Sequence, residues 1–562
     1  MSVLVAKSKE QIKKIVTTAA KKLMSENILE SAELTEFSVE VPANREHGDY
    51  AVNAAMVWAR LFHKAPRQIA ELLSAHFDFE GSYINRCEIA GPGFINFFLD
   101  DTYYSEIIKD IKTKGDDYGK SDFGEGMRVL VEFVSANPTG PMHIGNARGG
   151  ALGDCLAAVL ETAGYAVERE FYINDAGNQI NKFGLSLDLR YLQLYKEGIE
   201  MPEDSYHGED IIAHAKAFAE IHGDAYVAAD EQERRAALVA FALPKNIKGL
   251  ETDLAKYRIT YDTWFKESTL HNNGETARII EKLKESGHTY ELEDALWFKA
   301  TDFGCDKDFV LVRANGVPTY VVPDIAYHYN KLVTRNFDMA IDILGADHHG
   351  YVPRLKAALT ALGVDADRLN VILMQMVRLV RDGEVIKASK RSGKAITLVT
   401  LLDEVPIDAA RFFFNLREAN SHFDFDLDLA VNESNSNPVY YVQYAHARIC
   451  SIMRNLEAEG IPMSECTVED LNKLTAPEER ELILHLAAFT DEVISSAKAY
   501  DPAKMTHYVS EVATKFHKFY AACRVKGEDT ALMQARLNLC YVTALVIRNV
   551  LKMLKIDAPE KM

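Results

Sequence analysis

The residues best suited to chemistry lie in residues 131–150, VEFVSANPTGPMHIGNARGG, where an apolar run passes through a Pro/Gly turn into a helical pattern. Residues 128–134 have the nearly continuous, β-branched character of a buried parallel strand, and the turn residues that follow end it. From Gly145 the apolar residues recur at helical spacing. His143 therefore lies beside a helix N-terminus, where free backbone N–H groups favour phosphate oxygens, so the stretch indicates a nucleotide site.

Two later stretches also carry polar chemistry. A buried strand predicted at residues 337–344 ends at GADHHG, and polar residues at the carboxyl end of a parallel strand are where open α/β sheets bind ligands. Neighbouring His348 and His349 on an extended chain point to opposite sides, which argues against a shared metal ion. The basic stretch KASKRSGK begins at Lys387. Alone it is typical of a solvated loop, but Lys387 and Lys390 on such a loop can close over phosphates and stabilise leaving pyrophosphate.

The motifs resemble those of a known family. His143-Ile-Gly-Asn146 resembles the His-Ile-Gly-His signature of class I aminoacyl-tRNA synthetases, and SANPTGPMHIG is close to its form in arginyl-tRNA synthetases. KASKR resembles the second class I signature, Lys-Met-Ser-Lys-Ser. The resemblance covers the whole chain and implies that arginine and ATP form arginyl-adenylate and pyrophosphate before arginine passes to the terminal adenosine of tRNA(Arg). The catalytic residues that it implies are His143, Asn146, Lys387 and Lys390. The implied ATP-binding residues are His143, Gly145, His348, His349, Lys387 and Lys390, with ATP taken together with Mg²⁺.

Two positions depart from the family pattern. Asn146 replaces the second signature His, and Asn can donate a hydrogen bond but cannot carry positive charge. Many arginyl-tRNA synthetases lack the second Lys of the other signature, whereas Lys390 is present here. The Lys387–Lys390 segment is therefore expected to do more of the phosphate chemistry.

Arginine as a substrate requires buried acceptors, because its guanidinium offers five donors and does not deprotonate. Glu132 and Asp324 are the carboxylates expected to bind it, with Tyr320 packed on the guanidinium plane. Ser135 and Asn137 are expected to hold the α-amino and carboxylate ends, helped by Asp347 or a neighbour. A pocket built around paired carboxylates should reject lysine, so no proofreading domain is expected.

Two aromatic segments are candidates for tRNA contact. In the family, the Gly-Phe-Ile-Asn element found here at residues 93–96 contacts the tRNA D-loop, so Phe94 would stack on a base and Asn96 would bond its edge. Tyr441, Tyr444 and Arg448 lie three and four residues apart on one predicted helix face. Such a stripe is more often core, but one that ends in Arg also suits single-stranded RNA. The resemblance adds Tyr520, Arg524 and Met562 to an anticodon site.

The expected fold is multidomain α/β, with a Rossmann-type class I catalytic core between an N-terminal α+β domain and a C-terminal all-α helical bundle. The domain boundaries are predicted at residues 1–118, 119–437 and 438–562, with a helical insertion at about 185–260. Two consecutive strand-helix units, the second with a strand at 168–173 and a helix capped by 174–179, imply a parallel sheet. Further expected elements are helices at 9–25 and 49–63, and strands at 37–42, 94–98, 297–301, 309–313, 320–323 and 374–379.

Composition sets further limits. The 562 residues carry a formal net charge of −20, which argues against an indiscriminate polyanion binder such as a DNA-binding protein. Residues 438–562 hold fifteen Lys and Arg against sixteen Asp and Glu, so a local basic face remains possible there. The seven cysteines lack zinc spacing. We therefore expect a cytoplasmic monomer with no membrane segment and no structural zinc or other metal site.

Alternatives come from other classes. A synthetase for another amino acid, such as cysteine or glutamate, shares both signatures, but it would not need the Glu132 and Asp324 pair. A non-catalytic tRNA-binding paralogue would be marked by loss of His143 or Lys390, and neither is lost. A stand-alone adenylyltransferase would be far shorter.

Overall fold

The computed structural model describes residues 3–42, 44, 47–386, 396–527 and 529–562. Its centre is a five-stranded parallel sheet with strand order β12-β11-β5-β6-β7. The strands are β5 (Arg128–Glu132), β6 (Ala166–Ile173), β7 (Thr263–Lys266), β11 (Met339–Gly345) and β12 (Leu369–Met374). The predicted parallel sheet is therefore confirmed, although β12 was not predicted.

The helix α5 (Ile144–Thr162) follows β5 and is buried along most of its length. Its close packing depends on Gly153, because a Cβ there would lie 2.2 Å from the ring of Phe133. This contact fixes α5 against the residues that leave β5. The predicted strand-turn-helix unit thus forms, with the strand ending at Glu132 rather than Val134.

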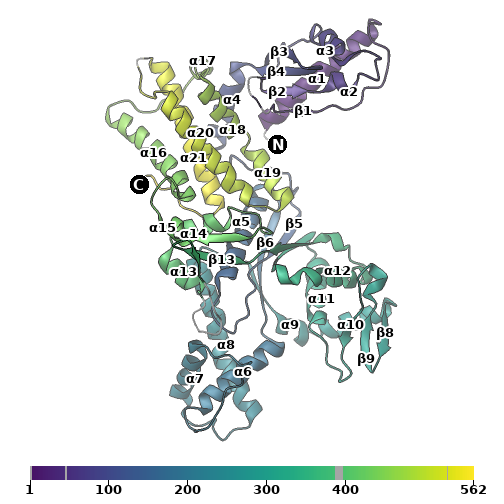
Figure 1. Ribbon diagram of the computed structural model, residues 1–562, viewed down its shortest axis with the longest axis vertical. Coiled ribbons are helices and arrows are strands. Elements are labelled where there is room, and N and C mark those ends of the chain that lie inside the picture. The colour runs from purple at the N-terminus through teal and green to yellow at the C-terminus, as the bar shows by residue number, and fades with distance from the viewer. Residues whose placement is uncertain (1–2, 43, 45–46, 387–395, 528) are drawn as a thin grey trace.

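The N-terminal region holds a four-stranded antiparallel sheet with order β1-β2-β4-β3 (Figure 1). The strands are β1 (Val39–Glu40), β2 (Tyr50–Val52), β3 (Ile84–Ala90) and β4 (Phe94–Leu99), and the helices are α1 (Val3–Ser25), α2 (Ala54–Val57), α3 (Pro66–Ser74) and α4 (Asp101–Lys114). The helix predicted at 49–63 is wrong, since this segment forms β2 and then the short α2. Asp49 accepts hydrogen bonds from the Leu99 N–H and the Tyr104 hydroxyl, which ties the segment to the sheet.

A helical insertion follows β6 and projects from the core as α6 (Gly177–Leu192), α7 (Glu209–His222) and α8 (Glu231–Lys256) (Figure 1). It has a small apolar core of its own and a buried ion pair between Arg234 and Asp188 at 2.5 Å. The N-cap residue of α6 is Ala176, within the predicted 174–179, but it makes no side-chain cap hydrogen bond. Asp175 accepts instead from the backbone N–H and hydroxyl of Ser268.

The segment between β7 and β11 contains α9 (Glu267–Asn272), α10 (Glu275–Glu285), a three-stranded antiparallel sheet and α11 (Val321–Tyr329). The sheet strands are β8 (Thr289–Leu292), β9 (Ala295–Phe298) and β10 (Phe309–Val312). The strand predicted at 320–323 is wrong, because these residues open α11. Pro323 is tolerated there since the first helical turn needs no backbone N–H donor. A π-helical turn, Asn330–Thr334, continues α11.

A second three-stranded sheet, order β14-β13-β15, lies between the core and the C-terminal region. It contains β13 (Val377–Arg381), β14 (Glu384–Val385) and β15 (Phe423–Asp426), so the strand predicted at 374–379 spans a break between β12 and β13. The neighbouring helices are α12 (Val352–Ala361), α13 (Leu398–Glu404), α14 (Ile407–Phe414) and α15 (Leu427–Val431).

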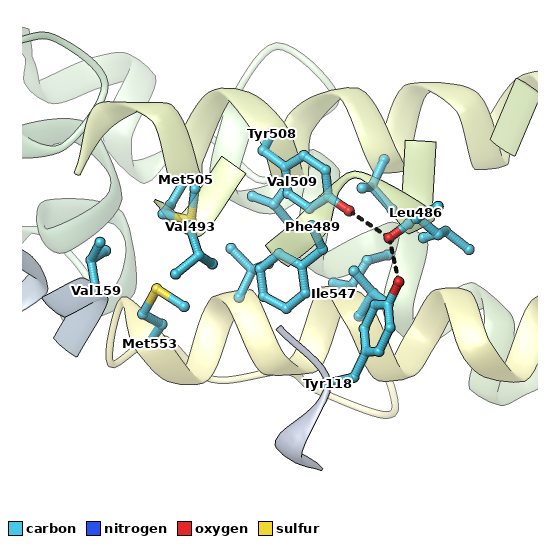
Figure 2. Close-up of a cluster of buried hydrophobic side chains, with 14 of the residues drawn as sticks. Tyr118, Val159, Leu486, Phe489, Val493, Met505, Tyr508, Val509, Ile547 and Met553 are labelled. Atoms are coloured by element: carbon cyan, nitrogen blue, oxygen red, sulfur yellow. Dashed lines mark hydrogen bonds between the residues drawn. The ribbon is translucent and has the colours of Figure 1, made fainter. Parts of the chain in front are cut away.

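The C-terminal region is the expected helical bundle. Its helices are α16 (Pro438–Ala458), α17 (Val468–Leu471), α18 (Pro477–Ala487), α19 (Phe489–Ala499), α20 (Ala503–Ala522) and α21 (Thr530–Met553). The helix α21 is long and apolar enough to cross a membrane, but most of its apolar stretch is buried inside the protein. Figure 2 shows its Ile547 and Met553 in a cluster with Phe489 and with Val159 of α5. Tyr118 closes this cluster by donating to the Leu486 carbonyl at 3.1 Å, so the bundle and the core share one apolar interior.

Candidate functional site

The N-terminus of α5 is built by a reciprocal cap. His143 is the N-cap residue, and its Nδ1 accepts a hydrogen bond from the Gly145 N–H at 3.1 Å. The Asn146 Oδ1 accepts from the His143 N–H at 3.1 Å. Asn146 therefore completes a capping box, which gives a structural reason for an amide where the signature has a second His. Because Nδ1 accepts, a neutral His143 ring carries its proton on Nε2, the donor that a phosphate oxygen requires.

The chain that follows the second basic stretch lies directly beside this cap. Thr397 forms an antiparallel bridge with His143, and the Leu398 N–H donates to the Met142 carbonyl at 2.9 Å. Thr397 also caps α13 with its side chain. The predicted phosphate-binding residues Lys387 and Lys390 lie outside the described residues. Thr397 and Leu398, about 250 residues after His143 in sequence, thus lie against the first signature.

A buried arginine that the sequence analysis did not single out holds α5 to the neighbouring chain. Arg148 is fully buried, and its guanidinium donates to the carbonyls of Gln375 at 2.8 Å, Glu418 at 3.0 Å and Ser421 at 3.2 Å. Burial lowers the Arg148 pKa to about 10. The side chain ties the helix that bears the cap to the segments that lead into β13 and β15.

A pocket of about 330 Å³ lies at the carboxyl ends of β5 and β11. It brings together five predicted residues, namely Glu132, Tyr320, Asp324, Asp347 and His348. Its other lining residues are Tyr172, Tyr327, His328, Asp342, Leu344, Tyr351 and Leu355. Parallel sheets bind ligands at this edge, so the position agrees with the fold. Ser135, Asn137 and His349 are not among the lining residues.

Asp324 enters the pocket from α11. The Tyr351 hydroxyl donates to its Oδ2 at 2.5 Å, and the Tyr320 and Tyr351 ring centroids are 5.8 Å apart. Burial raises the Asp324 pKa to about 6, although the Tyr351 hydrogen bond opposes this shift. Tyr320 itself is 66% exposed, so its ring can cover a ligand from the solvent side.

Glu132 enters from the end of β5 with both oxygens already hydrogen-bonded. Its Oε1 accepts from the Ser135 hydroxyl at 2.8 Å, and its Oε2 accepts from the Lys331 ammonium at 2.5 Å. Val134 and Ser135 have φ values of 70° and 38°, a left-handed backbone that non-glycine residues rarely adopt. This turn places the Ser135 hydroxyl against Glu132, whereas Asn137 lies exposed farther along it.

The remaining predicted nucleotide residues follow β11. Asp347, His348 and His349 are exposed on the 3₁₀ turn Ala346–Gly350, and only the first two line the pocket. Across the described ranges no three His, Cys, Asp or Glu side chains form a group that could hold a metal ion.

The sequence analysis missed Lys331, His328, Asp342 and Tyr351. Asp324, His328 and Lys331 are spaced four and three residues apart, which puts them on one helix face. That face was hidden because the preceding residues were assigned to a strand. Asp342 gave a second signal, since it is the one acid within the apolar strand β11.

The predicted tRNA residues of the N-terminal sheet divide by burial. Phe94 opens β4 and is 40% exposed, so its ring is accessible. Asn96 is buried between its partners Ala51 of β2 and Glu88 of β3. A base edge therefore reaches Phe94 far more readily than Asn96.

The predicted residues of the bundle gather on one face of α16 and α20. The Arg448 guanidinium lies 4.5 Å from the Tyr520 ring centroid and 5.6 Å from that of Tyr444. His517 lies against both Tyr441, at 4.9 Å, and Tyr444, at 6.1 Å. We call Tyr441, Tyr444, Arg448, His517 and Tyr520 the aromatic cluster.

Two further residues extend this face. Tyr520 and Arg524 line a pocket of about 500 Å³ together with residues of α16. The C-terminal segment runs along α16, where the Gln443 amide donates to the Asp557 carbonyl and His446 bonds the Pro559 carbonyl, both at 2.9 Å. Met562 ends this segment and is 52% exposed.

Comparisons with known proteins agree along the whole chain. Three family descriptions match: "Arginyl tRNA synthetase N terminal domain" at residues 10–99, "tRNA synthetases class I (R), catalytic domain" at 108–449, and "DALR anticodon binding domain" at 442–562. The chain is 52% identical to the Arginine–tRNA ligase of Acetivibrio thermocellus and 53% identical to that of Caldanaerobacter subterraneus, covering 100% of both chains in each case. A Thermus thermophilus arginyl-tRNA synthetase structure has a TM-score of 0.73 at 21% identity, covering 99% of this chain and 100% of that one.

Proposed function

Since the chain belongs to the arginyl-tRNA synthetase family, we propose that it is an ATP-dependent arginine–tRNA ligase. The full-length relatives confirm the family resemblance found in the sequence, and the class I catalytic match confirms the predicted fold class. The reaction joins the arginine carboxylate to the α-phosphate of ATP with release of pyrophosphate, and then transfers arginine to the 3′-terminal adenosine of tRNA(Arg).

The observation that carries the residue assignment is the pairing of Glu132 and Asp324 in one pocket. The two carboxylates come from β5 and α11, and each is already oriented by a hydroxyl, from Ser135 and Tyr351 respectively. Each carboxylate oxygen has a second lone pair to offer, so the pair can accept several of the five guanidinium donors. Tyr320 covers the guanidinium plane, and Asp347 at the pocket rim binds the α-amino group.

Ser135 takes a different role from the one first expected. Its hydroxyl is engaged with Glu132, and it also accepts from the Tyr172 N–H at 3.2 Å, so it holds the carboxylate in place. Asn137, exposed on the turn between the pocket and α5, remains the candidate for the arginine carboxylate. We place that carboxylate on the side of the pocket that faces the ATP site.

ATP binds along the N-terminus of α5, with its phosphates toward the backbone N–H groups near Gly145 and the His143 Nε2. His348 and His349 lie on the β11 side of this site. Lys387 and Lys390 neutralise the β- and γ-phosphates and the departing pyrophosphate. ATP is taken as its Mg²⁺ complex, since Mg²⁺ binds chiefly through phosphates and water with few protein ligands.

The tRNA contacts are assigned to two parts of the chain, the N-terminal sheet and the C-terminal bundle. Phe94 and Asn96 are assigned to the D-loop, and the aromatic cluster with Arg524 and Met562 is assigned to the anticodon. We place the enzyme in the cytoplasm, as expected of a translation enzyme, and we propose that it acts as a monomer, because one chain supplies the arginine pocket, the ATP site and both tRNA surfaces.

The test is arginine-dependent exchange of labelled pyrophosphate into ATP, run with and without tRNA(Arg) and with lysine, glutamate and cysteine in place of arginine. Of the four amino acids, we expect only arginine to support exchange. Exchange with glutamate or cysteine would assign another class I specificity, and no exchange under any condition would assign a non-catalytic tRNA-binding role.

A further inference from the structure

Three carboxylates stand side by side on neighbouring strands at the arginine pocket, and two of them, Glu132 and Asp342, line it. In the parallel sheet Asp342 of β11 is paired in register with Glu132 of β5, and Glu132 is paired with Glu170 of β6. All three are buried, at 2%, 7% and 0% exposure. Like charges directly opposite each other on neighbouring strands destabilise a sheet, so this acidic row requires fixed positive charge.

Lys331 supplies that charge at the centre of the row. It is completely buried, and its ammonium donates to the Glu132 Oε2 at 2.5 Å and to the Asp342 Oδ1 at 2.8 Å. It also lies 4.1 Å from the ring centroid of Tyr327. Although burial disfavours its charge, Asp342, Glu132 and Glu170 raise the Lys331 pKa, so the ammonium stays charged at neutral pH.

Each end of the row has a further basic partner. At one end the His328 Nε2 bonds the Asp342 Oδ2 at 2.6 Å, while its Nδ1 bonds the Asp324 carbonyl at 2.7 Å. At the other end Arg335 bonds Glu170 at 2.5 Å, and the Tyr327 hydroxyl donates to the same carboxylate at 2.6 Å. The ionisable groups that surround Lys331 are thus Glu132, Glu170, Asp324, Tyr327, His328, Arg335 and Asp342.

We propose that Lys331 is a positioning residue for arginine recognition: it balances Asp342 so that Glu132 stays ionised and aimed at the substrate guanidinium. This inference rests on the proposed role of Glu132. Without the ammonium, Glu132 and Asp342 face each other in register with no cation between them, and one of them takes up a proton. A protonated or displaced Glu132 loses both charge and acceptor capacity toward a guanidinium.

The decisive test separates charge balance from packing with a paired substitution. Lys331→Met keeps an unbranched apolar stem but removes the charge. We expect it to raise the arginine KM in pyrophosphate exchange about tenfold or more, which corresponds to a loss of about 1.4 kcal/mol in binding free energy. The ATP KM should stay within about twofold of the wild-type value. Adding Asp342→Asn removes the competing carboxylate, so the double variant should recover most of the arginine KM.

Three matched variants make the outcome clear. Asp342→Asn alone leaves Lys331 facing Glu132, and it is the reference against which the double variant is compared. Lys282 is an exposed lysine of the neighbouring α10, 5.5 Å from the Tyr329 ring of α11. Lys282→Met should change neither KM value. Glu132→Gln tests the arginine site itself and should raise the arginine KM strongly.

The results that would overturn the inference are equally specific. It fails if Lys331→Met changes both KM values and kcat together, or if the double variant is as defective as the single one. If Lys331→Met does not fold, the double variant is compared with Asp342→Asn, and an arginine KM tenfold higher in the double variant overturns the inference, because Lys331 should matter little once Asp342 carries no charge. An unchanged arginine KM in Glu132→Gln would instead refute the proposed arginine site.

Discussion

The proposed arginine pocket and the aromatic cluster of the bundle present opposite kinds of surface. In the pocket Glu132 is buried and Asp324 half-buried, and each of these carboxylates is already bonded to a neighbour such as Tyr351, Ser135 or Lys331. In the cluster the rings and Arg448 are only partly buried and lean on one another. An enzyme that must distinguish arginine from lysine needs hydrogen-bond acceptors in fixed positions, whereas a site for an unpaired base needs an accessible flat surface.

The largest effect should follow from Asp324→Asn in the pocket. Asn keeps the acceptor for the Tyr351 hydroxyl but removes the charge that faces the guanidinium. We expect kcat/KM for arginine in aminoacylation to fall about 100-fold, because truncating a buried charge pair costs about 2–5 kcal/mol. The tRNA KM should not change.

Tyr351→Phe is the matched variant for this substitution, since it removes only the hydroxyl that orients Asp324. It should lower kcat/KM for arginine less than Asp324→Asn does. An Asp324→Asn enzyme with wild-type arginine kinetics would place the guanidinium elsewhere.

A smaller effect, on the other ligand, is expected from Arg448→Ala in the bundle. Loss of the guanidinium from the Tyr444 and Tyr520 rings should raise the tRNA(Arg) KM about tenfold, since each stacking contact contributes about 1–3 kcal/mol. The arginine KM should stay within about twofold, and the salt dependence of tRNA binding should weaken. Lys552→Ala, at an exposed cation of α21, is the control. A raised arginine KM in Arg448→Ala would show that the two regions are not independent.

The sequence predicted the parts of these regions that are local. The strand and turn before His143, the helix after it and the α16 stripe are each contained in about twenty residues, where periodicity and turn chemistry decide the structure. Glu132 and Asp324 were predicted because the resemblance implies a guanidinium substrate, which demands buried acceptors. The resemblance, rather than periodicity, led to Tyr520 and Arg524.

The missed residues depend on long-range contacts. Lys331 meets Glu132 across 199 residues, and no local pattern shows that pairing. The segments at 49–63 and 320–323 were assigned wrongly because short apolar runs suit helix and strand alike until the neighbouring chain decides. In the first case β4 draws residues 50–52 into a sheet, and in the second residues 321–323 form the first turn of α11, which tolerates Pro323.

The pH dependence of the two regions should also differ, by a still smaller factor. Burial raises the Asp324 pKa to about 6, so the empty pocket gains a proton as pH falls through that value. A bound guanidinium favours the ionised carboxylate, so the arginine KM should rise about twofold at pH 6 and further below it. In the aromatic cluster, burial and Arg448 lower the His517 pKa, so its titration moves to lower pH, away from neutrality.

The measurement for this comparison is the arginine KM and the tRNA KM of the wild-type enzyme between pH 8 and pH 5.5. Asp324→Asn should abolish the rise in arginine KM. A tRNA KM that follows the arginine KM over the same range would contradict the assignment to Asp324.

The smallest effect is expected from Tyr444→Phe, which tests whether tRNA recognition depends on the tyrosine ring or on its hydroxyl. The Tyr444 ring is stacked 6.3 Å from that of Tyr440 and 6.1 Å from that of His517, and Phe preserves both contacts. If stacking carries recognition, Tyr444→Phe should change the tRNA KM less than twofold, while Tyr444→Ala should raise it about fivefold or more. If Tyr444→Phe were as defective as Tyr444→Ala, the hydroxyl would be reading a base edge, and the cluster would resemble the arginine pocket in relying on placed polar atoms.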